Sequence, residues 1–241
     1  MRILSKGKTI NLNLLPPAAY FEPLLLYLVL FFSAAAVPLT AALPAAAPGT
    51  AVQPQSIIEF SAAGELIRLI TYTIPALGLI WYLILKKNSL DIQRPMTVQI
   101  NDFYSLILGL PGLILISALT SFLMTKFPPS AIPPKIRPPF GASGWIVMVF
   151  SCAGTGYLEE SFFRFYLLQK LKDWIPRAVP RILFAVLLFT FCHGYEGPWG
   201  MLNAALAGIL LSILFEKFKT IHGLAWAHAC YNAFVYITGI F

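Results

Sequence analysis

Residues 144–168 read GWIVMVFSCAGTGYLEESFFRFYLL, a largely apolar run that holds two adjacent carboxylates and one guanidinium. The apolar residues on both sides of Glu159, Glu160 and Arg164 are typical of a membrane-spanning helix. An ionisable side chain at this depth is energetically costly and usually faces a partner or a water-filled cavity. These three charges therefore predict a functional site inside the membrane.

The composition of the chain excludes a soluble domain. Of the 241 residues, 58% are apolar and 11% are charged, which leaves too little polar surface to cover a water-exposed fold. Seven stretches lack charged residues, and most reach the length that crosses a hydrocarbon core of about 30 Å. They are Leu24–Leu43, Leu69–Leu85, Phe103–Thr125, Gly141–Leu158, Ile182–Tyr195, Gly197–Phe215 and Gly223–Phe241. The predicted fold class is all-α, a polytopic transmembrane helix bundle of about seven spans, or eight if Ile57–Gly64 forms its own interfacial helix.

The net charge of +7 is explained by membrane topology. With the N-terminus in the cytoplasm, most Lys and Arg residues fall on the cytoplasmic side, and only Lys126, Lys135 and Arg137 fall outside. This distribution follows the positive-inside rule. Basic and aromatic residues are not interleaved as they are on nucleic-acid surfaces. We therefore expect an integral membrane protein with a cytoplasmic N-terminus, in contact with membrane lipids and without a nucleic-acid partner.

The chain divides into three predicted parts. Residues 1–125 comprise an N-terminal cytoplasmic segment and three membrane spans, residues 126–143 form an extracytoplasmic loop, and residues 144–241 form a core of four spans. The loop is rich in proline between Pro128 and Pro139, which favours extended, polyproline-like backbone. All of the chemical candidates lie in the third part.

Helical spacing separates the roles of the two adjacent glutamates. Residues four apart lie on one face of a helix, whereas adjacent residues diverge by about 100°. Glu160 and Arg164 are four apart and can pair, which leaves Glu159 directed toward a neighbouring helix. A carboxylate without its own guanidinium in such a site can act as a general base.

Two later spans each add a histidine to this carboxylate. His193 follows Phe189 by four residues, and Asn232 follows His228 by four. At 1.5 Å per residue from the span ends, Glu159 and both histidines fall between the midplane and the cytoplasmic side. All three groups can therefore meet in one site.

Metal and thiol chemistry are alternative interpretations of the same segments. Cys192 and Cys230 adjoin the two histidines, but adjacent helical positions face different ways and no Cys-x-x-Cys spacing is present. The His-Glu-x-x-His signature of zinc proteases is absent as well. Two histidines and one glutamate still form an alternative ligand set for a divalent metal such as zinc.

Non-catalytic interpretations also exist for each group. Glu160 with Arg164 can be a neutralised structural clamp, the histidines can be interhelical hydrogen-bond donors, and Asn232 can hold helices together. A proton-coupled transporter would use the same carboxylate and histidines as a relay. The internal repeats that many transporters contain are not visible in this sequence, which disfavours that class.

Three ordered motifs in the chain resemble those of the CPBP family, the CAAX-protease and bacteriocin-processing group also called Abi. The motifs are Glu159-Glu160-x-x-x-Arg164, Phe189-x-x-x-His193 and His228-x-x-x-Asn232. The likeness extends from Gly144 to Ile237 and includes the run His193-Gly194-Tyr195-Glu196-Gly197-Pro198-x-Gly200 that is common in bacterial members. The first three spans are similar only as generic hydrophobic helices.

The resemblance implies a glutamic-type intramembrane endopeptidase with an all-helical core, acting on a membrane-associated protein or peptide. The implied catalytic residues are Glu159 and His193, which activate water, and His228 and Asn232, which stabilise the oxyanion. The implied supporting residues are Glu160, Arg164 and Phe189. This mechanism requires no cofactor, and the implied location is the bacterial inner (plasma) membrane. The alternative is a non-proteolytic membrane scaffold or immunity protein of the same family.

Overall fold

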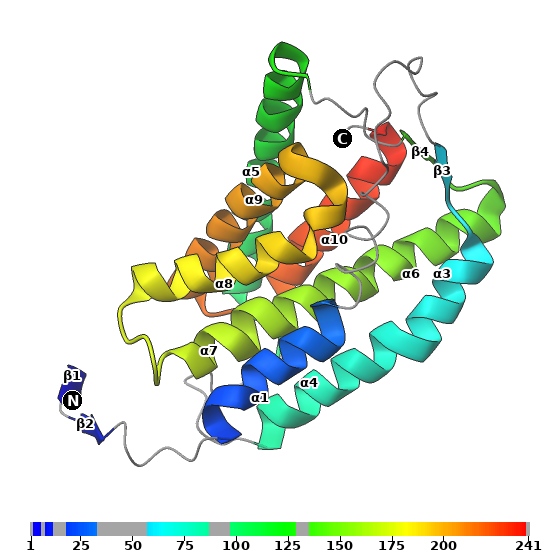
Figure 1. Cartoon of the computed structure of the whole chain (residues 1–241). Helices are drawn as coiled ribbons and strands as arrows, with labels where there is room; N and C mark the ends of the chain where they lie inside the picture. Colours follow the sequence, from blue (N-terminus) through cyan, green and yellow to red (C-terminus); the bar gives the residue numbers. More distant parts are fainter. Residues whose placement is uncertain are drawn as a thin grey trace, which may run out of the picture.

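Helices make up most of the chain that the computed structural model describes, which comprises residues 2–5, 8–11, 18–32, 57–86, 97–128 and 135–239 (Figure 1). Several helices continue into one another without a break. The first half contains α1 (Ala18–Tyr27) with the π-helical turn η2 (Leu28–Phe32), then α3 (Ala62–Arg68), η3 (Leu69–Thr73) and α4 (Ile74–Lys86), and then α5 (Ile100–Lys126). The second half contains α6 (Gly141–Glu160), η4 (Ser161–Leu167) and α7 (Leu168–Leu171), then α8 (Ala178–Cys192), η5 (Gly194–Glu196), α9 (Gly197–Phe218) and α10 (His222–Thr238).

The predicted all-α helix bundle is confirmed. Each of the seven predicted spans coincides with a helix over the residues that the structure describes. Three of the described segments are long and apolar enough to cross a membrane, namely Ala62–Lys86, Ile100–Lys126 and Gly194–Phe218, and the apolar helices Phe21–Phe32 and Ala178–Cys192 are shorter. The later half of the predicted span Leu24–Leu43 lies outside the described residues, as does the middle of the Pro-rich loop.

The possible eighth helix over Ile57–Gly64 is wrong. Residues 57–59 form strand β3 (Ile57–Glu59), which pairs in parallel with β4 (Lys135–Arg137) from the end of the Pro-rich loop. Ser61 then caps α3, because its hydroxyl accepts a hydrogen bond from the backbone N–H of Gly64 at 3.2 Å. Helix α3 runs directly into η3 and α4, so residues 62–64 belong to the second span. A short antiparallel pair near the N-terminus, β1 (Arg2–Ser5) and β2 (Lys8–Asn11), is likewise absent from the sequence prediction.

Helix α6 occupies the middle of the bundle. It lies between the α3–α4 segment on one side and α10 on the other, while α5 packs against α9 and α10, and α8 packs against α9 (Figure 1). Gly156 allows α6 and α10 to approach closely, since a Cβ atom there would lie 2.7 Å from the carbonyl oxygen of Ala225 and 3.0 Å from the backbone nitrogen of Ala229. This contact brings the charged end of α6 against the middle of α10.

The start of α10 is fixed by the start of α5. Asp102 is buried and accepts hydrogen bonds from the backbone N–H groups of Gln99 and Gly223, each at 2.8 Å. The first backbone N–H groups of a helix have no partner within that helix. These two bonds satisfy such donors at the starts of α5 and α10. A Cβ atom on Gly223 would lie 1.9 Å from the carbonyl oxygen of Asp102, so a glycine is required here. The depth of α10 in the bundle is therefore set at its first turn.

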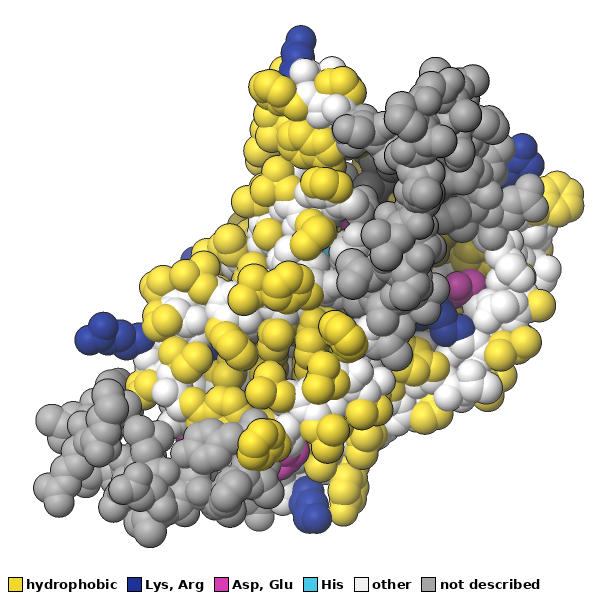
Figure 2. Space-filling model, viewed as in Figure 1, with side chains coloured by type: hydrophobic (Ala, Val, Ile, Leu, Met, Phe, Trp, Pro, Cys, Tyr) yellow, Lys and Arg dark blue, Asp and Glu magenta, His cyan; other side chains and the backbone are white. Residues whose placement is uncertain are grey.

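Apolar side chains cover most of the described surface in the view of Figure 2, where basic and acidic groups are sparse. Ile107 and Leu115 of α5 and Phe150 of α6 are examples, since each of these side chains is more than 60% exposed. A soluble protein rarely exposes apolar patches of such extent. These side chains are therefore positioned to contact lipid, as expected for an integral membrane protein.

Candidate functional site

Glu160, Arg164 and His228 form a buried charged triad at the end of α6. Arg164 donates from Nη1 to Oε1 of Glu160 at 3.1 Å, and the Nδ1 atom of His228 lies 2.8 Å from the same oxygen. The side chains of Glu160 and Arg164 are 0% and 1% exposed, and that of His228 is 8% exposed. Because an ionised carboxylate only accepts hydrogen bonds, Nδ1 of His228 carries the proton. The expected pairing of Glu160 with Arg164 is present, and the additional bond to His228 joins α6 to α10.

Glu159 lies on the other side of the same imidazole. Its Oε2 atom is 3.8 Å from Nε2 of His228, which is longer than a hydrogen bond. This oxygen is buried and makes no hydrogen bond with any described residue, while the side chain as a whole is 16% exposed. Buried polar atoms in proteins are almost always paired with protein or with ordered water. Glu159 is thus the carboxylate of the pair that is open to an incoming group.

Phe189 links the histidine of α8 to the triad. Its ring centroid lies 4.6 Å from that of His193 and 6.3 Å from that of His228, and the guanidinium carbon of Arg164 lies 4.3 Å from it. The Nδ1 atom of His193 is 2.8 Å from the carbonyl oxygen of Phe189, so the Nδ1–H donates to that carbonyl. Nε2 of His193 is therefore the ring nitrogen that is not used in this bond. Phe189 therefore lies beside both histidine rings and the guanidinium of Arg164.

Two predicted residues, His193 and Asn232, form no hydrogen bond or ion pair with the triad among the described residues. His193 is partly buried at the end of α8, and no ion pair joins it to Glu159 in the described part of the chain. Asn232 lies one helical turn after His228 and is partly buried, and it forms no hydrogen bond with a described residue. The structure thus brings Glu159, Glu160, Arg164 and His228 together, with His193 attached through Phe189.

Glu196 is a charged neighbour of the site that the spacing argument did not identify. It lies in the η5 turn that connects α8 to α9, and it is close enough to interact electrostatically with His193, Glu159 and His228. The only signal in the sequence was its position three residues after His193. A carboxylate in a short connection has no helical periodicity to show which way it points.

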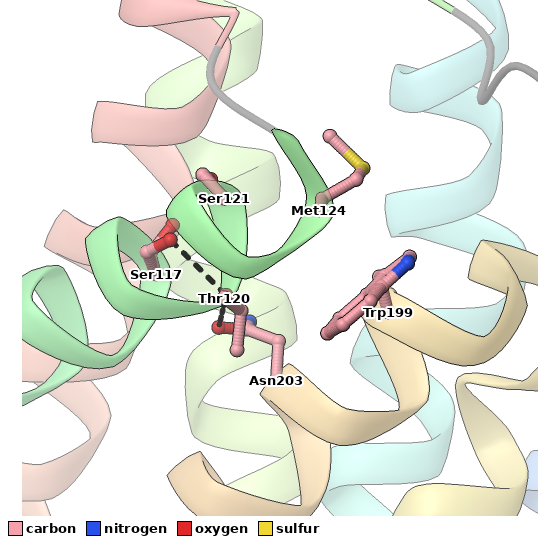
Figure 3. Close-up of a pocket in the computed structure, with 6 residues that line it drawn as sticks. All are labelled: Ser117, Thr120, Ser121, Met124, Trp199 and Asn203. Carbon is pink, nitrogen blue, oxygen red and sulfur yellow. Dashed lines mark hydrogen bonds between the residues drawn. The ribbon is translucent and has the colours of Figure 1, made fainter. Parts of the chain in front are cut away.

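A small polar pocket lies between α5 and α9, and it contains none of the predicted catalytic residues (Figure 3). Its lining residues are Ser117, Thr120, Ser121, Met124, Trp199 and Asn203. Thr120 donates to Oδ1 of Asn203 at 3.2 Å, and Nδ2 of Asn203 donates to the hydroxyl of Tyr231 at 3.0 Å. Through Tyr231 this network ties α5 and α9 to α10, next to Asn232. We interpret it as a polar packing contact between the three helices.

A metal ion would need several His, Cys, Asp or Glu side chains that point toward one place. Within the described ranges, no three His, Cys, Asp or Glu side chains converge as metal ligands do. One oxygen of Glu160 is already bonded to both a guanidinium and an imidazole. A structural or catalytic zinc site takes at least three protein ligands. The side-chain arrangement does not fit such a site, and no step of the chemistry below passes through a metal.

Residues 141–234 match the family model described as Type II CAAX prenyl endopeptidase Rce1-like. The matched region starts at the first residue of α6 and ends inside α10, so it contains every predicted site residue. No curated protein and no solved structure shows significant similarity to the chain.

Proposed function

We propose that the chain is an intramembrane endopeptidase of the glutamic type, because residues 141–234 match the family model described as Type II CAAX prenyl endopeptidase Rce1-like. It hydrolyses a peptide bond in a membrane-associated protein or peptide. The observation that carries this proposal is the unequal environment of two adjacent carboxylates. Oε1 of Glu160 is held by Arg164 and His228 and its side chain is 0% exposed, whereas Glu159 forms no hydrogen bond with a described residue and its side chain is 16% exposed.

Glu159 is the proposed general base. An attacking water molecule gives a proton to its carboxylate while the water oxygen bonds to the carbonyl carbon of the scissile peptide. His193 assists from the opposite helix, because its Nδ1–H is occupied by the Phe189 carbonyl and its Nε2 is available to accept a hydrogen bond. The family resemblance supports the same pair of residues for water activation.

His228 and Asn232 are proposed to stabilise the oxyanion. A protonated His228 would keep its Nδ1–H on Glu160 and present its Nε2–H on the side of Glu159. The amide of Asn232 is one turn along the same helix and free of other described partners. Donors held in place before the reaction stabilise developing charge most effectively, because they need no reorganisation. Glu160 and Arg164 therefore act by holding the His228 ring.

Collapse of the tetrahedral intermediate completes the reaction. The carbon–nitrogen bond breaks, and the proton taken up by Glu159 passes to the leaving amine. One water and one peptide bond yield one carboxylate product and one amine product, with no redox change. The site therefore requires only water besides the peptide.

We place the chain in a plasma membrane, of the bacterial inner-membrane type, with its N-terminus in the cytoplasm. The support is the excess of Lys and Arg in the segments assigned to that side. The substrate is then a protein or peptide that is itself embedded in or anchored to the same membrane. Such a substrate reaches the site by lateral diffusion rather than from solution.

The test compares membrane peptides and proteins from cells that carry the wild type or Glu159→Gln. The amide removes the base and preserves the shape of the side chain, so uncleaved substrates should accumulate in the variant. Glu216→Gln is the matched control, since Glu216 is a glutamate of α9 that pairs with Arg181 and Lys219 and forms no hydrogen bond or ion pair with the triad among the described residues. Identical profiles for wild type and Glu159→Gln would reject the proposed activity.

A further inference from the structure

A second set of polar side chains lies on the face of α6 that leads to Glu159. Arg68 of α3 donates from Nη2 to Ser151 at 2.8 Å and to Thr155 at 3.3 Å. Arg68 also donates to Oε2 of Glu65 at 2.7 Å, and the hydroxyl of Ser151 donates to that same oxygen. We call these four residues, Glu65, Arg68, Ser151 and Thr155, the α3–α6 polar cluster.

The α3–α6 polar cluster contains charged groups that are partly exposed, on a helical segment long enough to cross a membrane. Glu65 and Arg68 belong to Ala62–Lys86, one of the segments long and apolar enough to cross a membrane. Their side chains are nevertheless 24% and 38% exposed. Charged groups in membrane segments face the interior of the bundle or a water-filled cavity, because exposure to lipid is too costly. Partial exposure of this ion pair therefore indicates hydration.

Helical spacing connects the α3–α6 polar cluster to the proposed base. Ser151, Thr155 and Glu159 are each four residues apart, so their side chains share one face of α6. The rise from Thr155 to Glu159 is about 6 Å, which one water molecule can bridge. A threonine hydroxyl carries one donor and two acceptor positions. Thr155 accepts from Arg68, which leaves its own proton and one lone pair for such a water.

The destination of this water is the unpartnered oxygen of Glu159. That Oε2 atom is buried and bonds to no described side chain. We infer that the α3–α6 polar cluster conducts hydrolytic water into the bundle and that Thr155 is a positioning residue, holding the water that Glu159 deprotonates. This inference rests on the proposed function and assigns the side from which water arrives. The peptide would then approach from the side of α8 and α10.

Kinetics of the full-length protein test the positioning role. Thr155→Val keeps the shape of the side chain and removes its hydroxyl, and Thr155→Ser restores the hydroxyl. We expect Thr155→Val to lower kcat roughly tenfold to a hundredfold with little change in KM, since a misplaced reactant costs up to about a hundredfold. Thr155→Ser should recover most of the rate. The assay uses a fluorogenic peptide carrying the cleavage site found in the membrane-peptide comparison.

Cysteine labelling tests the hydration separately from catalysis. In a chain whose Cys152, Cys192 and Cys230 are replaced by alanine, a charged thiol reagent added to lipid nanodiscs should modify Thr155→Cys. It should modify Val149→Cys much more slowly, since Val149 is 56% exposed on the same helix and positioned to contact lipid. Thiolates react only where water reaches them.

Two results would overturn the inference and leave the proposed function intact. The first result is a set of kinetic constants in which Glu159→Gln is inactive but Thr155→Val keeps the wild-type kcat. A loss of kcat in Thr155→Ser as large as that in Thr155→Val would count in the same way. The other is labelling of Thr155→Cys that is no faster than that of Val149→Cys. Full cleavage by Glu159→Gln would instead reject the proposed function. Even then, the labelling rate of Thr155→Cys would measure whether water reaches the α3–α6 polar cluster, because labelling does not depend on catalysis.

Discussion

Replacing Gly156 with alanine should separate α6 from α10 at the proposed site. The new Cβ atom would lie 2.7 Å from the carbonyl oxygen of Ala225, whereas ordinary contacts begin near 3.4 Å, so α10 must move by about 0.7 Å. His228 follows Ala225 by one turn, and its 2.8 Å bond to Glu160 would stretch to the limit of hydrogen bonding. Overpacking of this kind costs about 1–3 kcal/mol of stability. Misplacing catalytic groups by this amount should cost roughly tenfold to a hundredfold in kcat/KM.

The assay measures thermal unfolding and kcat/KM of purified Gly156→Ala in the same lipid nanodiscs. Gly78→Ala in α4 is the matched control, because a Cβ atom there meets nothing within 4 Å. The control should be neutral, or stabilised by up to about 1 kcal/mol through helix propensity, with an unchanged rate. A wild-type rate and melting temperature in Gly156→Ala would refute the claim that this close approach sets the His228–Glu160 geometry.

Three further predictions concern the triad and its chemistry. Arg164→Met should lower the free energy of unfolding by about 3–5 kcal/mol, because it removes the guanidinium from the buried carboxylate of Glu160. Denaturant titration checks this, and a shift below about 1 kcal/mol would show that the bond to His228 is sufficient to stabilise that carboxylate. His228→Gln should reduce kcat by about a hundredfold or more while the protein stays folded, since it removes an oxyanion donor. Steady-state kinetics measures kcat and circular dichroism checks the fold; an unaffected kcat would contradict the oxyanion role. Incubation with a strong chelator should leave the cleavage rate unchanged, whereas a loss that is reversed by added zinc would contradict the metal-free mechanism.

The helical architecture could be predicted because charge-free stretches of membrane-spanning length are explicit in the sequence. The pairing of Glu160 with Arg164 was also predictable, since it depends only on spacing within one helix. Phe189 beside His193 follows from the same spacing. Each of these features is local to one segment of the chain.

Features that depend on how helices meet could not be predicted in this way. The bond from Glu160 to His228 depends on the rotation of α10 about its axis and on its depth, which Asp102 and Gly223 set at the first turn. Spacing alone paired Glu160 with Arg164, whereas the oxyanion role of His228 came from the family resemblance. The α3–α6 polar cluster was also missed, because Arg68 bonds across helices that are more than 80 residues apart in sequence. The strand over residues 57–59 was missed because its partner strand lies at the end of the Pro-rich loop, far away in the sequence.

The central claim is that the carboxylate of Glu159 removes a proton from the attacking water. The most direct measurement is kcat for purified Glu159→Gln, with Glu216→Gln as the control in the same membrane preparation. The account predicts a loss of at least about a hundredfold in Glu159→Gln, in line with general-base catalysis. The control should stay within about twofold of the wild type. A kcat for Glu159→Gln close to that of the wild type would contradict the account.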